Sequence, residues 1–364
     1  MGLLTARRAG LAVAVAILGV IALDVLLWDS LRPRATPTPP ITPGLRGRTA
    51  AECAACHPEQ AEEWRSSRMA GSWAAASFRA DWDDEDRLPF CLDCHAPLEA
   101  QQDTLVDGVW WPLPLRLISR PNPDFDPELR AEGVTCTACH ALPDGAIATT
   151  RAVDAPHATR VDPTLPTRCA RCHQSPEVWL HPLDRPMFDT VGEHARWQAA
   201  TGATAGCVDC HLPVVPRAGG RVGRAHTFRG GWDPEMLARA VSLSPVTRDG
   251  DAWSVVVTNR AGHAFPTGET TGGAVVRWVG VGPDGTETTA ETWLARRIVG
   301  PPFVDAGDTT LAGGEARTLR VTLPPGTRGV RAEVRLRRYA FAEHLRYAAD
   351  PMDLDLPIAA SPAW

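Results

Sequence analysis

Five copies of one pattern, C-x-x-C-H, run through the first two-thirds of the sequence. They are Cys53-Ala-Ala-Cys56-His57, Cys91-Leu-Asp-Cys94-His95, Cys136-Thr-Ala-Cys139-His140, Cys169-Ala-Arg-Cys172-His173 and Cys207-Val-Asp-Cys210-His211. These motifs use all 10 cysteines of the 364 residues. Two thiols three positions apart lie on one face of a helical turn, and a histidine follows directly. This spacing predicts covalent attachment of c-type haem, with each motif histidine as the proximal iron ligand.

Other uses of paired cysteines account less well for the pattern. Zinc ribbons combine C-x-x-C units in pairs, and a four-cysteine zinc site has no need of a histidine after each pair. A thioredoxin-like motif would occur once, beside a βαβ pattern. A disulfide framework would not place a histidine after every pair. We therefore predict haem c, with its iron, attached at all five motifs.

The N-terminus has the pattern of an export segment. Arg7 and Arg8 precede an apolar stretch from Ala9 to Leu23, which continues after Asp24 through Trp28. The stretch has about 20 residues, which is long enough to span a bilayer, and no small-residue cleavage motif follows it. We expect an uncleaved anchor within residues 1–30, with a cleaved signal peptide as the alternative. The arginines would stay inside, and the haem-bearing part would lie on the periplasmic side of the inner membrane.

Two regions are expected after a proline-rich linker at residues 31–48. Residues 49–240 hold the five motifs, and about 190 residues are too few to enclose each haem in its own side-chain core. The fold there should be a mostly irregular and helical wrapping around the haems. The net charge of −6 gives no reason to expect nucleic acid as a partner.

The residue pattern changes at residues 241–340, where an all-β, immunoglobulin-like sandwich is expected. Alternating strand candidates are separated by turns that contain glycine and proline. The candidates are Ala240 to Val246, Trp253 to Asn259, Ala274 to Val281, Thr286 to Ile298, Ala316 to Leu323 and Val330 to Tyr339. A turn is expected at Thr247 to Gly250, between the first two. The tail at residues 341–364 should be irregular, with one short helical piece around His344.

The distal ligands of the irons decide what the haems can do. Six histidines remain outside the motifs, and they are His157, His181, His194, His226, His263 and His344. Any single histidine is more often a surface or core residue than a ligand. Five irons in need of partners make these six the natural candidates.

Three stretches make residues 49 to about 268 similar to multihaem cytochromes of the cytochrome c-554 type, especially bacterial ones with a C-terminal β domain. They are Trp64-Arg-Ser-Ser-Arg-Met69-Ala70, the last motif with His226-Thr-Phe-Arg-Gly-Gly231 downstream, and Gly262-His263-Ala-Phe-Pro-Thr-Gly268. The last resembles the G-H-x-F-P-T-G loop of that family. In the first stretch, Met69 stands where the resemblance implies a haem-ligating histidine.

The candidate distal ligands are therefore Met69, His157, His226 and His263. Of His181 and His194, between the fourth and fifth motifs, one could serve as a further ligand. The thioether of Met69 is able to bind iron, although methionine is also a common core filler. His263 lies in a loop that follows a strand, with glycines at both ends and a proline within. If it reaches an iron, the β domain completes a haem site.

The sequence favours an exported electron carrier that works between redox partner proteins over a catalyst. The alternative is a multihaem oxidoreductase, of the nitrogen or sulfur oxyanion reductase type, with one five-coordinate haem. A third possibility makes the β domain a docking module for a partner. Protomers could also associate or stack, which the sequence does not decide.

Overall fold

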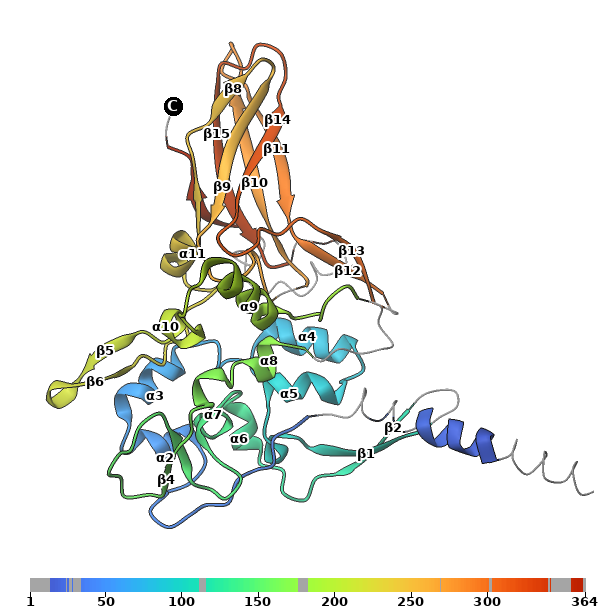
Figure 1. The fold of residues 1–364 in the computed structure, drawn as a ribbon, viewed down its shortest axis with the longest axis vertical. Helices are drawn as coiled ribbons and strands as arrows, with labels where there is room; N and C mark the ends of the chain where they lie inside the picture. The colour runs from blue at the N-terminus through green and yellow to red at the C-terminus, as the bar shows by residue number, and fades with distance from the viewer. Residues whose placement is uncertain are drawn as a thin grey trace, which may run out of the picture.

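The computed structural model describes residues 14–23, 25, 28, 34–110, 116–175, 183–268, 270–300, 303–339, 341 and 355–362. Figure 1 shows a lower region of short helices and small two-stranded sheets, and a long β unit above it. Among the described residues, no helix is long and apolar enough to cross a membrane. The expected anchor at 1–30 is described only at 14–23, 25 and 28, where the backbone is helical; its other residues lie outside the described part.

Every C-x-x-C-H motif of the lower region lies on or beside a helix of four or five residues. These helices are α2 (Ala50–Ala54), α5 (Leu92–His95), α7 (Cys136–His140), α8 (Ala170–His173) and α10 (Cys207–His211). The other helices are α3 (Pro58–Arg65), α4 (Ala76–Asp84), α6 (Pro127–Ala131), α9 (Thr190–Thr201) and α11 (Pro234–Ala240). Such short helices are marginal alone, so their packing must fix them.

Three small sheets connect the helices, which the expectation of irregular wrapping did not include. Two are antiparallel hairpins and one is parallel: β1 (Thr104–Trp110) with β2 (Arg116–Pro121), β5 (Val214–Arg217) with β6 (Arg221–Arg224), and β3 (Ile147–Thr149) with β4 (Thr159–Val161). Side-chain cores here are small. One contains Trp82, Leu92 and Ala96, and another contains Leu98, Ala100 and Leu129. Small cores agree with a region built around a large prosthetic group.

The upper region is a two-sheet β unit, as the sequence predicted. One sheet has the order β11-β10-β15-β16, the other β14-β9-β7 with β8 also on β9, and β12 and β13 form a separate pair. The strands are β7 (Val241–Leu243), β8 (Thr247–Asp249), β9 (Ala252–Asn259), β10 (Gly273–Val281), β11 (Glu287–Leu294), β12 (Arg296–Val299), β13 (Val304–Asp308), β14 (Ala316–Thr322), β15 (Gly329–Arg337) and β16 (Leu356–Ala360).

One continuous apolar cluster fills the space between the two sheets. Val255 and Val257 of β9 contribute from one sheet, and Val276 and Trp278 of β10 contribute from the other. The indole of Trp278 is completely buried. Burial of a large side chain of this kind contributes about 1.5–3 kcal/mol relative to an exposed one. The β unit therefore has a side-chain core of its own, unlike the lower region.

Three details of the β unit differ from the sequence expectation. The tail was expected to be irregular, but residues 356–360 form β16, which pairs with β15. The single strand expected over 286–298 is divided into β11 and β12. The expected turn at 247–250 is mostly strand β8, and the chain turns at Gly250, where φ is +61°. Local pattern identifies strands here but does not locate their ends.

Candidate haem sites

The motif helices pack against one another through their cysteines. The side chain of Cys53 lies against that of Cys136, which brings the first and third motifs together. Similar contacts join Cys94 to Cys172 and Cys169 to Cys207. Arg168, just before the fourth motif, donates to the carbonyl of Cys139 in the third. All five attachment points thus form one connected cluster.

Backbone carbonyls fix the ring orientation of three motif histidines. The Nδ1 atom of His95 donates to the carbonyl of Ser72 at 2.8 Å, and that of His140 donates to Ala148 at 3.1 Å. His211 donates in the same way to the carbonyl of Arg229. A bond at Nδ1 selects one tautomer and leaves Nε2 for a metal, which is the usual arrangement of ligating histidines.

Three motif histidines have a second imidazole opposite them. The ring centroids are 6.4 Å apart for His57 and His157, 6.1 Å for His140 and His226, and 6.2 Å for His211 and His263. A metal bound by two imidazole nitrogens at about 2 Å each would hold the ring centroids about 6 Å apart. These pairs are too far apart for direct ring contact and have the right separation for an iron between them.

The second imidazole of each pair is oriented like the first. Nδ1 of His226 donates to the carbonyl of Arg224 at 3.0 Å, and Nδ1 of His263 donates to that of Ala264 at 2.9 Å. Nδ1 of His157 lies 3.4 Å from the carbonyl of Ala158. In each case Nε2 is the nitrogen left for a metal. The residues present therefore fit a haem iron with two axial histidines.

Desolvation keeps these imidazoles in the form that binds metal. Burial is the main cause that lowers the pKa of the histidines in the cluster, namely His57, His95, His140, His173, His226 and His263. Neighbouring imidazoles lower the pKa further in several of them, as His157 does for His57. A lowered pKa favours the neutral ring, which is the ligating species.

His95 and His173 have no imidazole opposite them within the described ranges. His95 instead stacks face to face on Phe78, with centroids 3.6 Å apart and planes 2° apart. Phe78 belongs to an aromatic cluster with Trp73 and Trp82. The sequence analysis did not single out Phe78, and no motif marks it.

Met69 lies close to the second and third motifs. Its carbonyl accepts from the amide of Val134 at 3.0 Å, and three residues later Ser72 contacts His95. The side chain of Met69 is half-buried. Ligation of iron by Met69 remains a prediction. His181 and His344 lie outside the described residues.

Both ring nitrogens of His194 contact backbone carbonyls. Its Nδ1 lies 2.7 Å from the carbonyl of Gly262, and its Nε2 lies 3.0 Å from that of Ala205. Both ring nitrogens are used by backbone acceptors, so neither is free for an iron. Ligation of an iron by His194 stays a prediction that these contacts do not support.

The loop that carries His263 is held from inside the β unit by Asn259. This side chain is fully buried, and its Nδ2 donates to the carbonyls of His263, Leu311 and Ala312 at 2.8–3.1 Å. Its Oδ1 accepts from the amide of Ala261. One amide side chain thus fixes the backbone on both sides of Gly262.

Known proteins resemble this chain in part of its sequence and in its fold. Residues 52–108 match the family model described as cytochrome c554 and c-prime. No curated protein gives a significant sequence match. A crystal structure of a penta-haem cytochrome c552 from Thermochromatium tepidum has a similar fold, with a TM-score of 0.66 and 20% identity over 88% of this chain and 99% of that chain.

Five attachment motifs and paired axial histidines define a c-type cytochrome with several haems. The match of residues 52–108 to the cytochrome c554 and c-prime model, and the fold similar to that of a penta-haem cytochrome c552, agree with this class. Its cofactor is covalently attached haem c with iron. The thioethers would come from the motif cysteines and the proximal ligands from the motif histidines.

Proposed function

We propose that this protein carries electrons between redox partner proteins through a connected set of haems. The observation that supports this most is the three histidine pairs at 6.1–6.4 Å. Haem iron supplies one-electron exchange between its ferric and ferrous states. Two axial imidazoles leave no iron position open for a substrate, so at these sites the protein's residues hold the iron and tune its potential.

The contacts between motifs suggest the order in which electrons pass. Cysteine sulfur is bonded directly to the haem periphery, so haems whose cysteines touch have their edges close together. Contacts of Cys53 with Cys136, and of Cys169 with Cys207, connect the first motif to the third and the fourth to the fifth. Arg168 connects the third to the fourth. The second motif joins at the fourth through Cys94 and Cys172, which makes the fourth haem a junction.

A second candidate function rests on His95 and His173. Neither has an imidazole opposite it in the described part of the chain. If one of these two irons is five-coordinate, it would be the place for catalysis. This would make the protein a reductase of nitrogen or sulfur oxyanions, fed by the remaining haems.

Carbon monoxide distinguishes the two functions, because it binds ferrous haem only at an open axial position. The reduced protein of an electron carrier should bind almost no carbon monoxide. Binding of one equivalent per chain, together with turnover of nitrite or sulfite, would favour the reductase and contradict the carrier.

We also propose that the protein works outside the cytoplasm, held at the inner membrane by residues 1–30. The apolar stretch after Arg7 and Arg8 supports this. N-terminal sequencing of membrane-extracted protein should begin at Met1 or Gly2. A start between residues 25 and 50 would show that the segment is cleaved.

A further inference from the structure

We infer that α9 is a positioning element for the fifth haem, and that Glu193 and His194 hold the two halves of that site together. The inference rests on the proposed ligation of one iron by His211 and His263. These two ligands come from different regions of the chain, and a helix that carries neither of them contacts the backbone beside both.

His194 connects the two halves directly. Its Nε2 contacts the carbonyl of Ala205, two residues before the fifth motif begins at Cys207. Its Nδ1 contacts the carbonyl of Gly262, the residue before His263. One side chain thus connects the segment just before α10 to the loop of His263.

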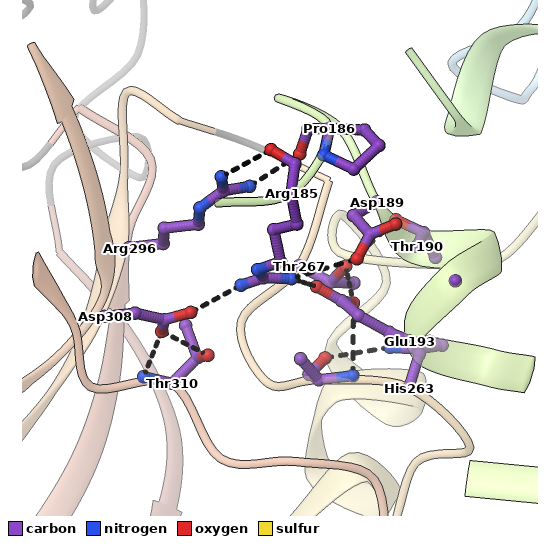
Figure 2. Close-up of polar contacts among 12 residues, drawn as sticks. Arg185, Pro186, Asp189, Thr190, Glu193, His263, Thr267, Arg296, Asp308 and Thr310 are labelled. Carbon is purple, nitrogen blue, oxygen red and sulfur yellow. Dashed lines mark hydrogen bonds and ion pairs between the residues drawn. The ribbon is translucent and has the colours of Figure 1, made fainter. Parts of the chain in front are cut away.

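Glu193 holds the other side of His263. Its carboxylate accepts from the amide of Ala264 at 3.2 Å and from the hydroxyl of Thr267 at 2.5 Å. Glu193 is 8% exposed, and its second oxygen accepts from Arg185, which also bonds to Asp308 at the end of β13. Figure 2 shows Glu193 between Arg185 and the loop of His263 and Thr267. Consecutive residues of α9 therefore clamp the residues before and after His263.

Close packing strengthens this clamp. A Cβ atom on Gly262 would lie 2.9 Å from the ring of Trp197, one turn further along α9. A Cβ atom on Gly313, in the neighbouring loop, would lie 3.0 Å from the same side chain. Only glycine allows the backbone to approach an aromatic ring this closely. Trp197 thus sets the distance from α9 to the loop, and the two hydrogen-bonding residues set its orientation.

The expected role is to fix the plane and distance of the His263 imidazole relative to His211. Their ring planes are 15° apart. The EPR signal of a low-spin haem with two imidazoles depends on the angle between the imidazole planes. Partners of this kind typically change metal affinity or activity by about 10- to 100-fold when they are removed. Loss of the clamp should therefore alter the signal of one haem and leave the others unchanged.

The test uses the haem-loaded protein and low-temperature EPR, with the midpoint potential of the affected haem as a second readout. His194→Ala and Glu193→Ala should each shift the signal of one low-spin haem and its potential. Glu193→Gln keeps an acceptor for the Ala264 amide but loses the one for Arg185, and should cause a smaller change than Glu193→Ala. His194→Gln keeps an amide donor, so its signal should shift less from wild type than that of His194→Ala. Gly262→Ala, which leaves both clamping side chains in place, should affect the same signal.

Two controls separate the possible failures. Arg196→Ala changes an exposed residue of α9 that pairs with Asp189 and should leave all signals unchanged. His263→Ala identifies the signal of the fifth haem. If His263→Ala changes no signal, the proposed ligation is wrong. If it does, and the His194, Glu193 and Gly262 variants lower only the resistance to urea without moving that signal, α9 is merely structural and the inference is overturned.

Discussion

His263 faces His211 with ring centroids 6.2 Å apart and planes 15° apart. One residue belongs to the β unit and the other to the last motif of the haem-bearing region. If an iron lies between them, as proposed, the β unit supplies one wall of a haem site. The loop of His263 is anchored to this unit through the buried side chain of Asn259.

Replacement of His263 with Ala should open one iron. The Ala side chain cannot ligate, and Asn259 continues to hold the loop in place, so no other residue is brought to the iron. We expect one low-spin haem to become high-spin and one carbon monoxide site to appear in the reduced protein. Arg196→Ala, at an exposed residue of α9, is the comparison variant. A fully low-spin His263→Ala protein that binds no carbon monoxide would exclude His263 as a ligand.

The number of haems per chain follows from the number of cysteines. All 10 lie in C-x-x-C-H motifs, so mass spectrometry of protein made with a haem-maturation system should show five haem increments. Cys210→Ser should weaken attachment at the fifth motif only. A wild-type mass with four or fewer increments would contradict the count.

Ligation of one iron by Met69 would give that haem a different midpoint potential from the others. A methionine ligand raises the potential of a haem relative to a second histidine. If Met69 binds iron, Met69→His should lower one transition in a redox titration and leave the others nearly unchanged. Met236→Leu, on α11, serves as the control for loss of a methionine elsewhere. An unaltered titration curve would assign Met69 to packing.

The buried pair of Arg296 and Asp305 should make the stability of the β unit depend on pH. Two nitrogens of Arg296 donate to the carboxylate of Asp305 at 2.7 and 3.0 Å, and the side chains are 7% and 13% exposed. Burial opposes ionisation of Asp305, but the bonds from Arg296 outweigh it, so the pKa of Asp305 is lowered. Asp305→Asn should cost about 3–5 kcal/mol of unfolding free energy near pH 7, because it leaves the buried charge of Arg296 without this carboxylate and with backbone carbonyls as its acceptors.

The sign of the pH effect follows from the lowered pKa. The stability from ionised Asp305 is fully present above the unfolded-state pKa of about 3.9 and is lost as pH falls through the lower folded-state pKa. Urea unfolding of wild type and Asp305→Asn should therefore give curves that converge in acid. A difference between them that is the same at pH 7 and in strong acid would contradict this role.

Much of this architecture can be predicted from the sequence, because its strongest signals are local. A C-x-x-C-H motif identifies a haem attachment point within five residues. Alternating residues such as Val255 and Val257 identify a strand within eight. The pattern of residues 262–268 marks His263 as a candidate iron ligand, although it does not say which motif histidine faces it.

The remaining features depend on contacts between distant segments, which local patterns do not contain. His194 looks like any other spare histidine until Gly262 and Ala205 are seen to occupy both its nitrogens. Phe78 acquires its position only where the chain brings it onto His95. The strand β16 forms because β15 offers an unpaired edge, and the composition of residues 356–360 gives little sign of it.

The most direct test of the central claim is the low-temperature EPR spectrum of the oxidised wild-type protein, quantified per haem. Three histidine pairs with an iron between them predict at least three low-spin signals of the bis-imidazole type for each chain. The His57, His140 and His211 sites would account for them, and the irons of His95 and His173 would give the remaining signals. A spectrum with fewer than three bis-imidazole signals, or one dominated by high-spin iron, would contradict the account.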